Sequence, residues 1–223
     1  MCGRYTLMKE KAELEGYFDA VMEDFESFGP NYNVAPTHTM PVVGANEDGH
    51  RTIRPFRWGL LPFWAKEQKV SYSMINARGE SVDSKKSYKG SFKRKRCLVP
   101  ASGFYEWTGK KGNKTPYYIY PTHEELFSFA GIYNVWESPE GDKVPTYSII
   151  TTQANKKMSE LHDRMPVMLL EEEWDEWLDP GNQNTKALKE LLQPFPDDGI
   201  GFHQVDKAVG KVKNNSKELI QAI

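Results

Sequence analysis

The stretch LFSFAGIYNVWESPEGDKVPTYSIITT, residues 126–152, decides the fold class. Leu126–Trp136 and Thr146–Thr152 are rich in the β-branched and aromatic residues that favour strands. Between them, Pro139–Gly141 supplies the Pro and Gly that mark a turn. Strand-like runs separated only by a turn favour antiparallel pairing, because parallel neighbours need a long crossover connection.

Similar short runs lie before this stretch and are again separated by turn signals rather than by long helices. The predicted strands are Thr39–Val43, Arg51–Trp58 and Pro116–Tyr120, and the turn signals are Asp48–Gly49 and Gly109–Gly112. Clustered strands predict an α+β fold, with a mixed but largely antiparallel sheet or open barrel as its core and helices on its flanks.

Helical periodicity is confined to a few segments. From Leu7 to Met22 apolar residues recur at spacings of three, four and seven, which predicts an amphipathic helix. Further helices are predicted at Asn155–Leu161, Leu170–Leu178 and Thr185–Leu192, and Asn31–Pro36 is predicted to be irregular. No segment has the composition of an interdomain linker, so we expect residues 1–223 to form one domain.

The composition, 39% hydrophobic and 27% charged residues, is that of an ordinary soluble globular protein. No run approaches the roughly 18 apolar residues of a membrane span, and the N-terminus has no signal-peptide core. We therefore expect a cytoplasmic protein, associated with the nucleoid when it binds DNA, and no membrane partner. In that compartment a disulfide is unusual, so Cys97 is predicted to be a small buried hydrophobe. The histidines show no zinc-like spacing with the cysteines, and we expect neither a metal nor a cofactor.

The net charge of −2 excludes bulk attraction to nucleic acid, but the positive charge is locally clustered. The run from Lys85 to Arg96 contains only basic charged residues. It indicates either a nucleic-acid footprint or a solvated basic loop, and its charge alone does not choose between them.

Cys2 follows the initiator methionine, which cells usually remove when the next side chain is small. Removal leaves a 1,2-aminothiol with an amine of pKa about 8 and a thiol of pKa about 8.5. An aldehyde condenses with such an amine to an imine, and the adjacent thiol then closes a five-membered thiazolidine. Ring closure is intramolecular and is favoured accordingly.

Seven blocks of sequence, taken together, resemble one family. They are CGRY (2–5), YNVAP (32–36), RWGLLPFW (57–64), INARGE (75–80), CLVPASGFYEW (97–107), LHDRMPV (161–167) and AVGKVKN (208–214). In this order and spacing the chain resembles the SRAP (SOS response-associated peptidase) family, whose members sense abasic sites in single-stranded DNA. The resemblance implies a compact fold with a barrel-like core beside a positively charged DNA groove, and a role in DNA damage and the SOS response.

The same resemblance implies catalytic roles for four residues. Cys2 matches the nucleophile that joins C1′ of the ring-opened deoxyribose. Asn76 matches the asparagine that orients the reacting amine, a task for which an amide offers donor and acceptor without charge. Glu106 and His162 match the groups that move protons, and an imidazole does so in both directions near pH 7.

Further residues match positions that hold the DNA strand. Arginine is suited to phosphate because its planar fork donates two hydrogen bonds at once, and rings stack on bases. The predicted phosphate contacts are Arg4, Arg78 and Arg164, and the predicted base contacts are Pro36 and Trp64.

Three functions fit the residues. The first is covalent capture of abasic sites in single-stranded DNA, with lyase-type strand cleavage by β-elimination from the imine as an additional reaction. The second is a cysteine hydrolase of the N-terminal-nucleophile type, a protease or amidohydrolase using Cys2, Glu106 and His162. The third is single-stranded DNA binding without chemistry. We expect the first, acting as a monomer.

Overall fold

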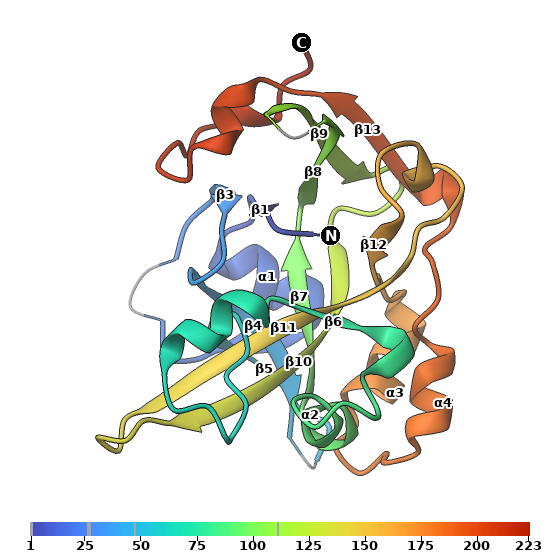
Figure 1. Ribbon diagram of the computed structural model, residues 1–223. Coiled ribbons are helices and arrows are strands. Elements are labelled where there is room, and N and C mark those ends of the chain that lie inside the picture. Colours follow the sequence, from blue (N-terminus) through green and yellow to red (C-terminus); the bar gives the residue numbers. More distant parts are fainter. Residues whose placement is uncertain (1, 26–27, 47, 111) are drawn as a thin grey trace.

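The computed structural model describes residues 2–25, 28–46, 48–110 and 112–223, and it builds the molecule around two sheets (Figure 1). Met1, whose removal the sequence predicts, lies outside the described residues. Five strands of the larger sheet close into a barrel in the order β11-β10-β7-β4-β5, because β5 pairs back onto β11. All of these pairings are antiparallel except β5–β11. The barrel strands are β4 (Thr39–Ala45), β5 (Arg51–Trp58), β7 (Arg96–Ala101), β10 (Phe127–Glu137) and β11 (Lys143–Gln153).

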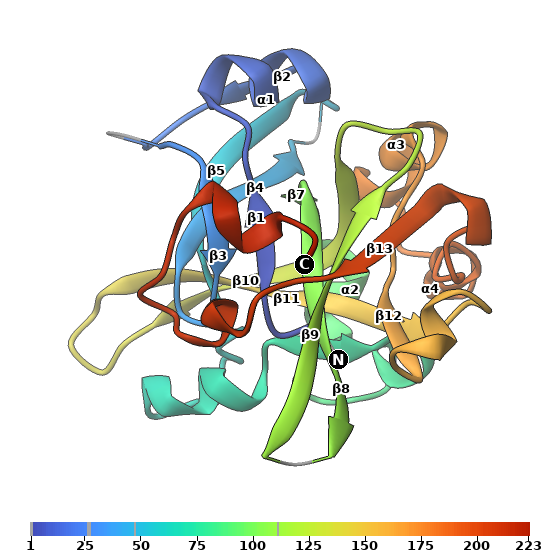
Figure 2. The same cartoon turned by 90° about the horizontal axis from the view of Figure 1, so that it is seen from above.

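The second sheet has five strands in the order β13-β9-β8-β1-β3, all antiparallel, and lies above the barrel in Figure 1. Its strands are β1 (Tyr5–Leu7), β3 (Asn31–Val34), β8 (Gly103–Lys110), β9 (Asn113–Pro121) and β13 (Ile200–Gln204). Seen from above in Figure 2, β8 and β9 form a long hairpin beside β1. Because β7 runs into β8 with only Ser102 between them, the chain passes directly from the barrel into this sheet.

Helices are short and lie outside the barrel. The α-helices are α1 (Lys11–Phe18), α2 (Lys89–Arg94), α3 (Trp174–Leu178) and α4 (Thr185–Glu190). The 3-10 turns are η1 (Gln68–Ser73), η2 (Gly79–Ser81), η3 (Met158–Glu160), η4 (Glu171–Glu173), η5 (Asp197–Gly199), η6 (Lys207–Gly210) and η7 (Lys217–Ile220). The remaining strands are β2 (Ala20–Met22), β6 (Asn76–Arg78) and β12 (Arg164–Pro166). Within the described ranges, no helix has the length and apolar character needed to cross a membrane.

The α+β class, the barrel-like core and the predicted strands are confirmed, and the strand ends differ from the predicted ones by at most three residues. The 126–152 hairpin forms, and its turn places Gly141 at φ 93°, a conformation that suits glycine. The predicted helix at Leu7–Met22 is wrong at both ends, since Leu7 belongs to β1 and pairs with Asn31. Asp19 ends α1 in a left-handed conformation, and the chain then enters β2.

Two further segments differ from expectation. Residues 31–34 form β3 instead of an irregular segment, because their backbone pairs with β1. The predicted helix at Asn155–Leu161 is only the 3-10 turn η3.

The core explains why the N-terminus is held in place. Tyr5 lies against Trp58 and Phe129, with ring centroids 5.1 and 6.2 Å apart, and its hydroxyl is 2.7 Å from that of Tyr147. All four side chains are fully buried. Because β1 is anchored by this aromatic contact, the residues just before it have a fixed position between the barrel and the second sheet.

Arg96 does not belong to a nucleic-acid footprint, although it ends the basic run. Its guanidinium is buried and donates to the backbone oxygens of five residues, Trp177, Phe92, Lys93, Asp179 and Asn182. These bonds join α2 to α3 and to the segment that follows α3, so Arg96 is a structural residue.

Arg96→Met is therefore expected to destabilise the fold by about 3 kcal/mol, because it leaves several buried carbonyls without donors. For a chain of this length that corresponds to a melting temperature lower by about 6–12 °C. Arg94→Met, at an exposed position of the same run, is the matched control and should melt within about 2 °C of the parent. Equal melting temperatures for both variants in a thermal scan would contradict this assignment.

Candidate active site

An open pocket of about 440 Å³ lies where the start of the chain meets the β8–β9 hairpin. It is lined by Gly3, Arg4, Glu106, Trp107, Lys114, His162 and Gly210. The structure thus brings two predicted proton-transfer residues, Glu106 and His162, together beside the residue that follows Cys2. The sequence did not predict three of these lining residues, Trp107, Lys114 and Gly210. Two of them, Trp107 and Gly210, lie inside blocks that resemble the family, and this was the only sequence signal for them.

Cys2 and Asn76 are in direct contact. The Asn76 side chain reaches from β6, which pairs in parallel with β11, and its Nδ2 donates to the Cys2 carbonyl oxygen at 2.7 Å. The Asn76 Oδ1 is buried and has no hydrogen-bond partner among the described residues. A buried acceptor of this kind suits an N–H donor supplied by the N-terminal residue or by a reaction intermediate.

The Cys2 thiol is fully buried, and its Sγ is 4.0 Å from the carbonyl oxygen of Arg4. Burial raises the pKa of this thiol well above its usual range, and the negative charge of Glu106 raises it further. The thiol is therefore neutral at pH 7, and the carboxylate that affects it is close by.

Glu106 lies on β8 and is only 5% exposed. Its register partner is Tyr117 on β9, and its chain neighbours are Tyr105 and Trp107. The Tyr105 hydroxyl donates to the Tyr32 carbonyl oxygen at 2.8 Å, which fixes the strand against β3. The carboxylate is thus held on a rigid strand rather than on a loop.

His162 lies between η3 and β12 with its ring partly buried. The Arg164 backbone N–H donates to its Nδ1 at 3.0 Å, and Asp163 Oδ1 lies 2.8 Å from the same atom. These two contacts hold the His162 ring at the edge of the pocket.

Arg4 lines the pocket, and its guanidinium also forms hydrogen bonds with other residues of the protein. Its Nη1 donates to Asn33 Oδ1 at 2.6 Å and to the Val209 carbonyl oxygen at 2.9 Å, and the guanidinium lies 5.8 Å from the Trp107 ring centroid. Burial lowers the pKa of Arg4. Its predicted phosphate contact remains a prediction.

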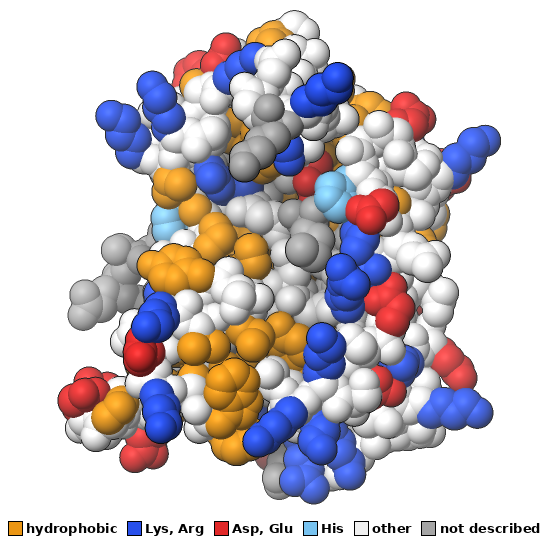
Figure 3. Space-filling model, in the orientation of Figure 1, with side chains coloured by type: hydrophobic (Ala, Val, Ile, Leu, Met, Phe, Trp, Pro, Cys, Tyr) orange, Lys and Arg blue, Asp and Glu red, His pale blue; other side chains and the backbone are white. Residues whose placement is uncertain are grey.

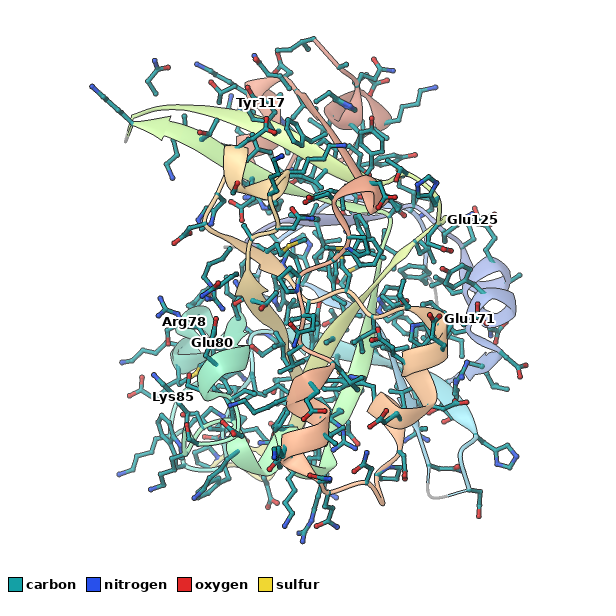
Figure 4. The ribbon with its side chains drawn as sticks, turned by 90° about the vertical axis from the view of Figure 1, so that its right-hand side faces the viewer. Arg78, Glu80, Lys85, Tyr117, Glu125 and Glu171 are labelled. Carbon is teal, nitrogen blue, oxygen red and sulfur yellow. The ribbon has the colours of Figure 1, made fainter. Side chains whose placement is uncertain are left out.

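The other two predicted phosphate contacts, Arg78 and Arg164, differ in exposure. Arg164 forms a bidentate pair with Glu80, at 2.8 and 2.9 Å, and also donates to the Thr151 carbonyl oxygen at 2.7 Å. This arginine holds the pKa of Glu80 below its usual value. Arg78 is exposed on β6, near Glu80 in Figure 4. Arg78 is thus the more accessible cation of the two.

Neither Pro36 nor Trp64 is among the residues that line the pocket. Pro36 lies in the turn between β3 and β4 and is partly exposed. Trp64 is 41% exposed and follows Phe63, which is 74% exposed. The contact of Pro36 and Trp64 with bases remains a prediction.

Part of the basic run does form a surface groove, of about 610 Å³, beside α2. It contains Lys86, Lys89, Arg94 and Lys95 together with the exposed Phe63, and the Lys86 ammonium lies 6.0 Å from the Phe63 ring centroid. Figure 3 shows Lys and Arg side chains gathered low on this face, next to hydrophobic ones. Cations beside an exposed ring are typical of single-stranded nucleic-acid surfaces.

Comparison with known proteins gives a consistent result. The family model described as SOS response associated peptidase (SRAP) matches residues 1–212. The chain is 41% identical over 231 residues to the Abasic site processing protein YoqW of Bacillus subtilis (strain 168), with both chains covered completely. It is 34% identical over 230 residues to the Abasic site processing protein HMCES of Xenopus tropicalis, covering 90% of this chain and 68% of that protein. A crystal structure of a protein from Bacteroides thetaiotaomicron superposes with a TM-score of 0.91 at 27% identity over the whole of both chains.

Proposed function

Because this chain belongs to the SRAP family, we propose that it processes abasic sites in single-stranded DNA by forming a covalent thiazolidine through Cys2. The observation that carries the proposal is the Asn76–Cys2 hydrogen bond beside a pocket lined by Glu106 and His162. An aldehyde in that pocket meets an oriented N-terminal residue and two proton-transfer groups. Removal of Met1 is the prerequisite, since the chemistry needs a free amine on Cys2.

The reaction proceeds in two steps. The Cys2 amine adds to C1′ of the ring-opened sugar, and the resulting carbinolamine loses water to give an imine. The thiol then adds to the imine carbon, its sulfur forming the new C–S bond and its proton passing to the imine nitrogen. One aldehyde and one aminothiol thus give one thiazolidine and one water.

The burial of the Cys2 thiol, which raises its pKa, supports this order of steps. A thiol whose pKa is raised is a poor nucleophile on its own, so the amine reacts first. Ring closure then benefits from having sulfur and imine on the same residue. The same feature disfavours a hydrolase mechanism, which requires a thiolate as the first nucleophile.

The surrounding residues have distinct roles in this proposal. Asn76 fixes the Cys2 backbone and offers its free Oδ1 to the amine. Glu106 and His162 move the protons needed to open the sugar and to expel water. An imine that loses a proton from C2′ before ring closure undergoes β-elimination, which gives strand cleavage as a minor reaction.

Preference for a single strand rests on the exposed rings. Phe63 and Trp64 offer faces to unpaired bases, and stacking contributes about 1–3 kcal/mol per base. Bases paired in a duplex are already stacked and leave these rings without partners.

Intact-mass analysis tests the proposal. The protein is incubated with a uracil-excised single-stranded oligonucleotide, with the undamaged oligonucleotide and with a duplex containing the abasic site. We expect a protein lacking Met1 whose mass rises, with the abasic single strand, by that of the oligonucleotide minus one water. Unchanged mass with the abasic strand, or hydrolysis of a peptide panel in the absence of DNA, would favour the alternatives.

A further inference from the structure

No function has yet been assigned to residues 208–214, although this block is one of the seven that resemble the family. It lies within residues 206–215, called here the basic segment, which include the exposed Lys207, Lys211 and Lys213 and a single acid, Asp206. Gly210 of this segment lines the pocket. Figure 2 shows the C-terminal part of the chain passing beside β3. The basic segment is therefore a rim of the pocket.

One buried side chain, Asn33 on β3, holds this rim. Its Nδ2 donates to the carbonyl oxygens of Val209, Lys211 and Asn214, at 3.3, 3.1 and 2.8 Å. Its Oδ1 accepts from Arg4 at 2.6 Å. Asn33 is 1% exposed, and both the oxygen and the nitrogen of its amide form hydrogen bonds with residues of the pocket wall.

The rest of the anchoring is also made by side chains. Asn215 Oδ1 accepts from the Tyr32 backbone N–H at 2.7 Å, and Lys207 Nζ lies 3.3 Å from Asn113 Oδ1. Val209 packs into a small cluster with Tyr105 and Tyr118. As far as the described residues extend, the segment contains a 3-10 turn but no strand pairing. A strand would be held by backbone pairing with its neighbours. The basic segment has no such pairing, so its conformation depends on the hydrogen bonds of the Asn33 amide.

We infer that the basic segment binds the phosphodiester backbone of the strand whose lesion enters the pocket, through Lys211 and Lys213, and that Asn33 is the positioning residue for this contact. Exposed cations beside a pocket that also contains Arg4 and Lys114 match the charge of a DNA backbone. Asn33 bonds to Arg4 and to the segment at once, so it couples the two cationic walls. The identity of the ligand rests on the proposed function.

Binding is measured with a single-stranded oligonucleotide carrying the unreactive tetrahydrofuran analogue of an abasic site. Asn33→Ala is expected to raise Kd about tenfold. Lys211→Ala/Lys213→Ala is expected to lower the magnitude of the slope of log Kd against log salt by about 1.4, or about 0.7 for each phosphate that the protein no longer neutralises. Because Asn33 acts through these lysines, combining both changes should raise Kd by less than the product of the separate effects.

Two variants separate positioning from general damage. Asn33→Asp keeps an acceptor for Arg4 but loses the donors to the segment, and should weaken binding as Asn33→Ala does. Lys143→Ala/Lys186→Ala, which removes two exposed lysines outside the basic segment, should leave the salt slope unchanged. The two lysine changes in the basic segment lie on the surface and keep the test valid if the Asn33 variants fold poorly.

An unchanged salt slope for Lys211→Ala/Lys213→Ala, or Kd effects that multiply fully with Asn33→Ala, would overturn the inference. Binding of the analogue does not require chemistry. If the parent protein bound the analogue but formed no adduct with reactive DNA, the proposed function would fail while the role of the segment stood.

Discussion

Cys2→Ala is expected to lower the yield of the stable adduct with abasic single-stranded DNA by at least about a hundredfold, because the alanine amine can form an imine but has no sulfur with which to close the ring. Imines hydrolyse readily, so the complex should appear only after reduction with borohydride. Denaturing gels with and without borohydride measure the two species separately. A heat-stable adduct formed by this variant without reductant would exclude the thiazolidine.

Cys97→Ala is the matched control for that experiment. Cys97 is the other thiol of the chain and is fully buried on β7, as the sequence predicted for a small core residue. Its removal should leave the adduct yield within about twofold. A chain in which an extra residue is retained ahead of Cys2 keeps the thiol but no longer carries a free amine on the same residue, and should give no stable adduct.

The 126–152 hairpin could be predicted from sequence because its information is local. Strand propensity and turn residues act over a few neighbours, and both agree there. The helix predicted at Leu7–Met22 was wrong for the opposite reason. Leu7 lies in a strand because its backbone pairs with Asn31, a residue distant in sequence. Periodicity reports which side chains become buried, and both a strand and a helix can bury Leu7.

In the candidate site, too, some features could be predicted from sequence and others could not. Residue types and family-like blocks pointed to Cys2, Asn76, Glu106 and His162, and the fold places the last two in one pocket beside the N-terminus. Sequence could not indicate that Arg96 is buried under five carbonyls, although it belongs to the same basic run as the exposed Arg94. Charge is visible in a sequence, but exposure depends on what packs over the residue.

The bonds around Arg4 connect fold to function. Arg4 joins β1, β3 and the basic segment through Asn33 and Val209. The wall of the pocket is therefore assembled from parts of the chain that are about two hundred positions apart. Such a pocket exists only in the folded protein, so under the proposed function an unfolded chain would lack the residues gathered around the reacting amine and thiol.

Glu106→Gln is expected to slow adduct formation by about 10²–10⁴-fold without changing the mass of the product. Proton transfer by a positioned group contributes about that much, and glutamine keeps the size of the side chain but cannot carry the proton. Glu106 lies on a rigid strand, so the substitution should leave the geometry intact. The Cys2 thiol loses the nearby negative charge that helps to raise its pKa. A more acidic thiol works against the predicted slowing, so a large loss of rate assigns the effect to proton transfer.

Glu171→Gln, which changes an exposed carboxylate on another side of the molecule from Arg78 (Figure 4), is the control and should react at the parental rate. Single-turnover kinetics at saturating DNA provide the measurement, and a Glu106→Gln rate within threefold of the parent would remove Glu106 from the mechanism.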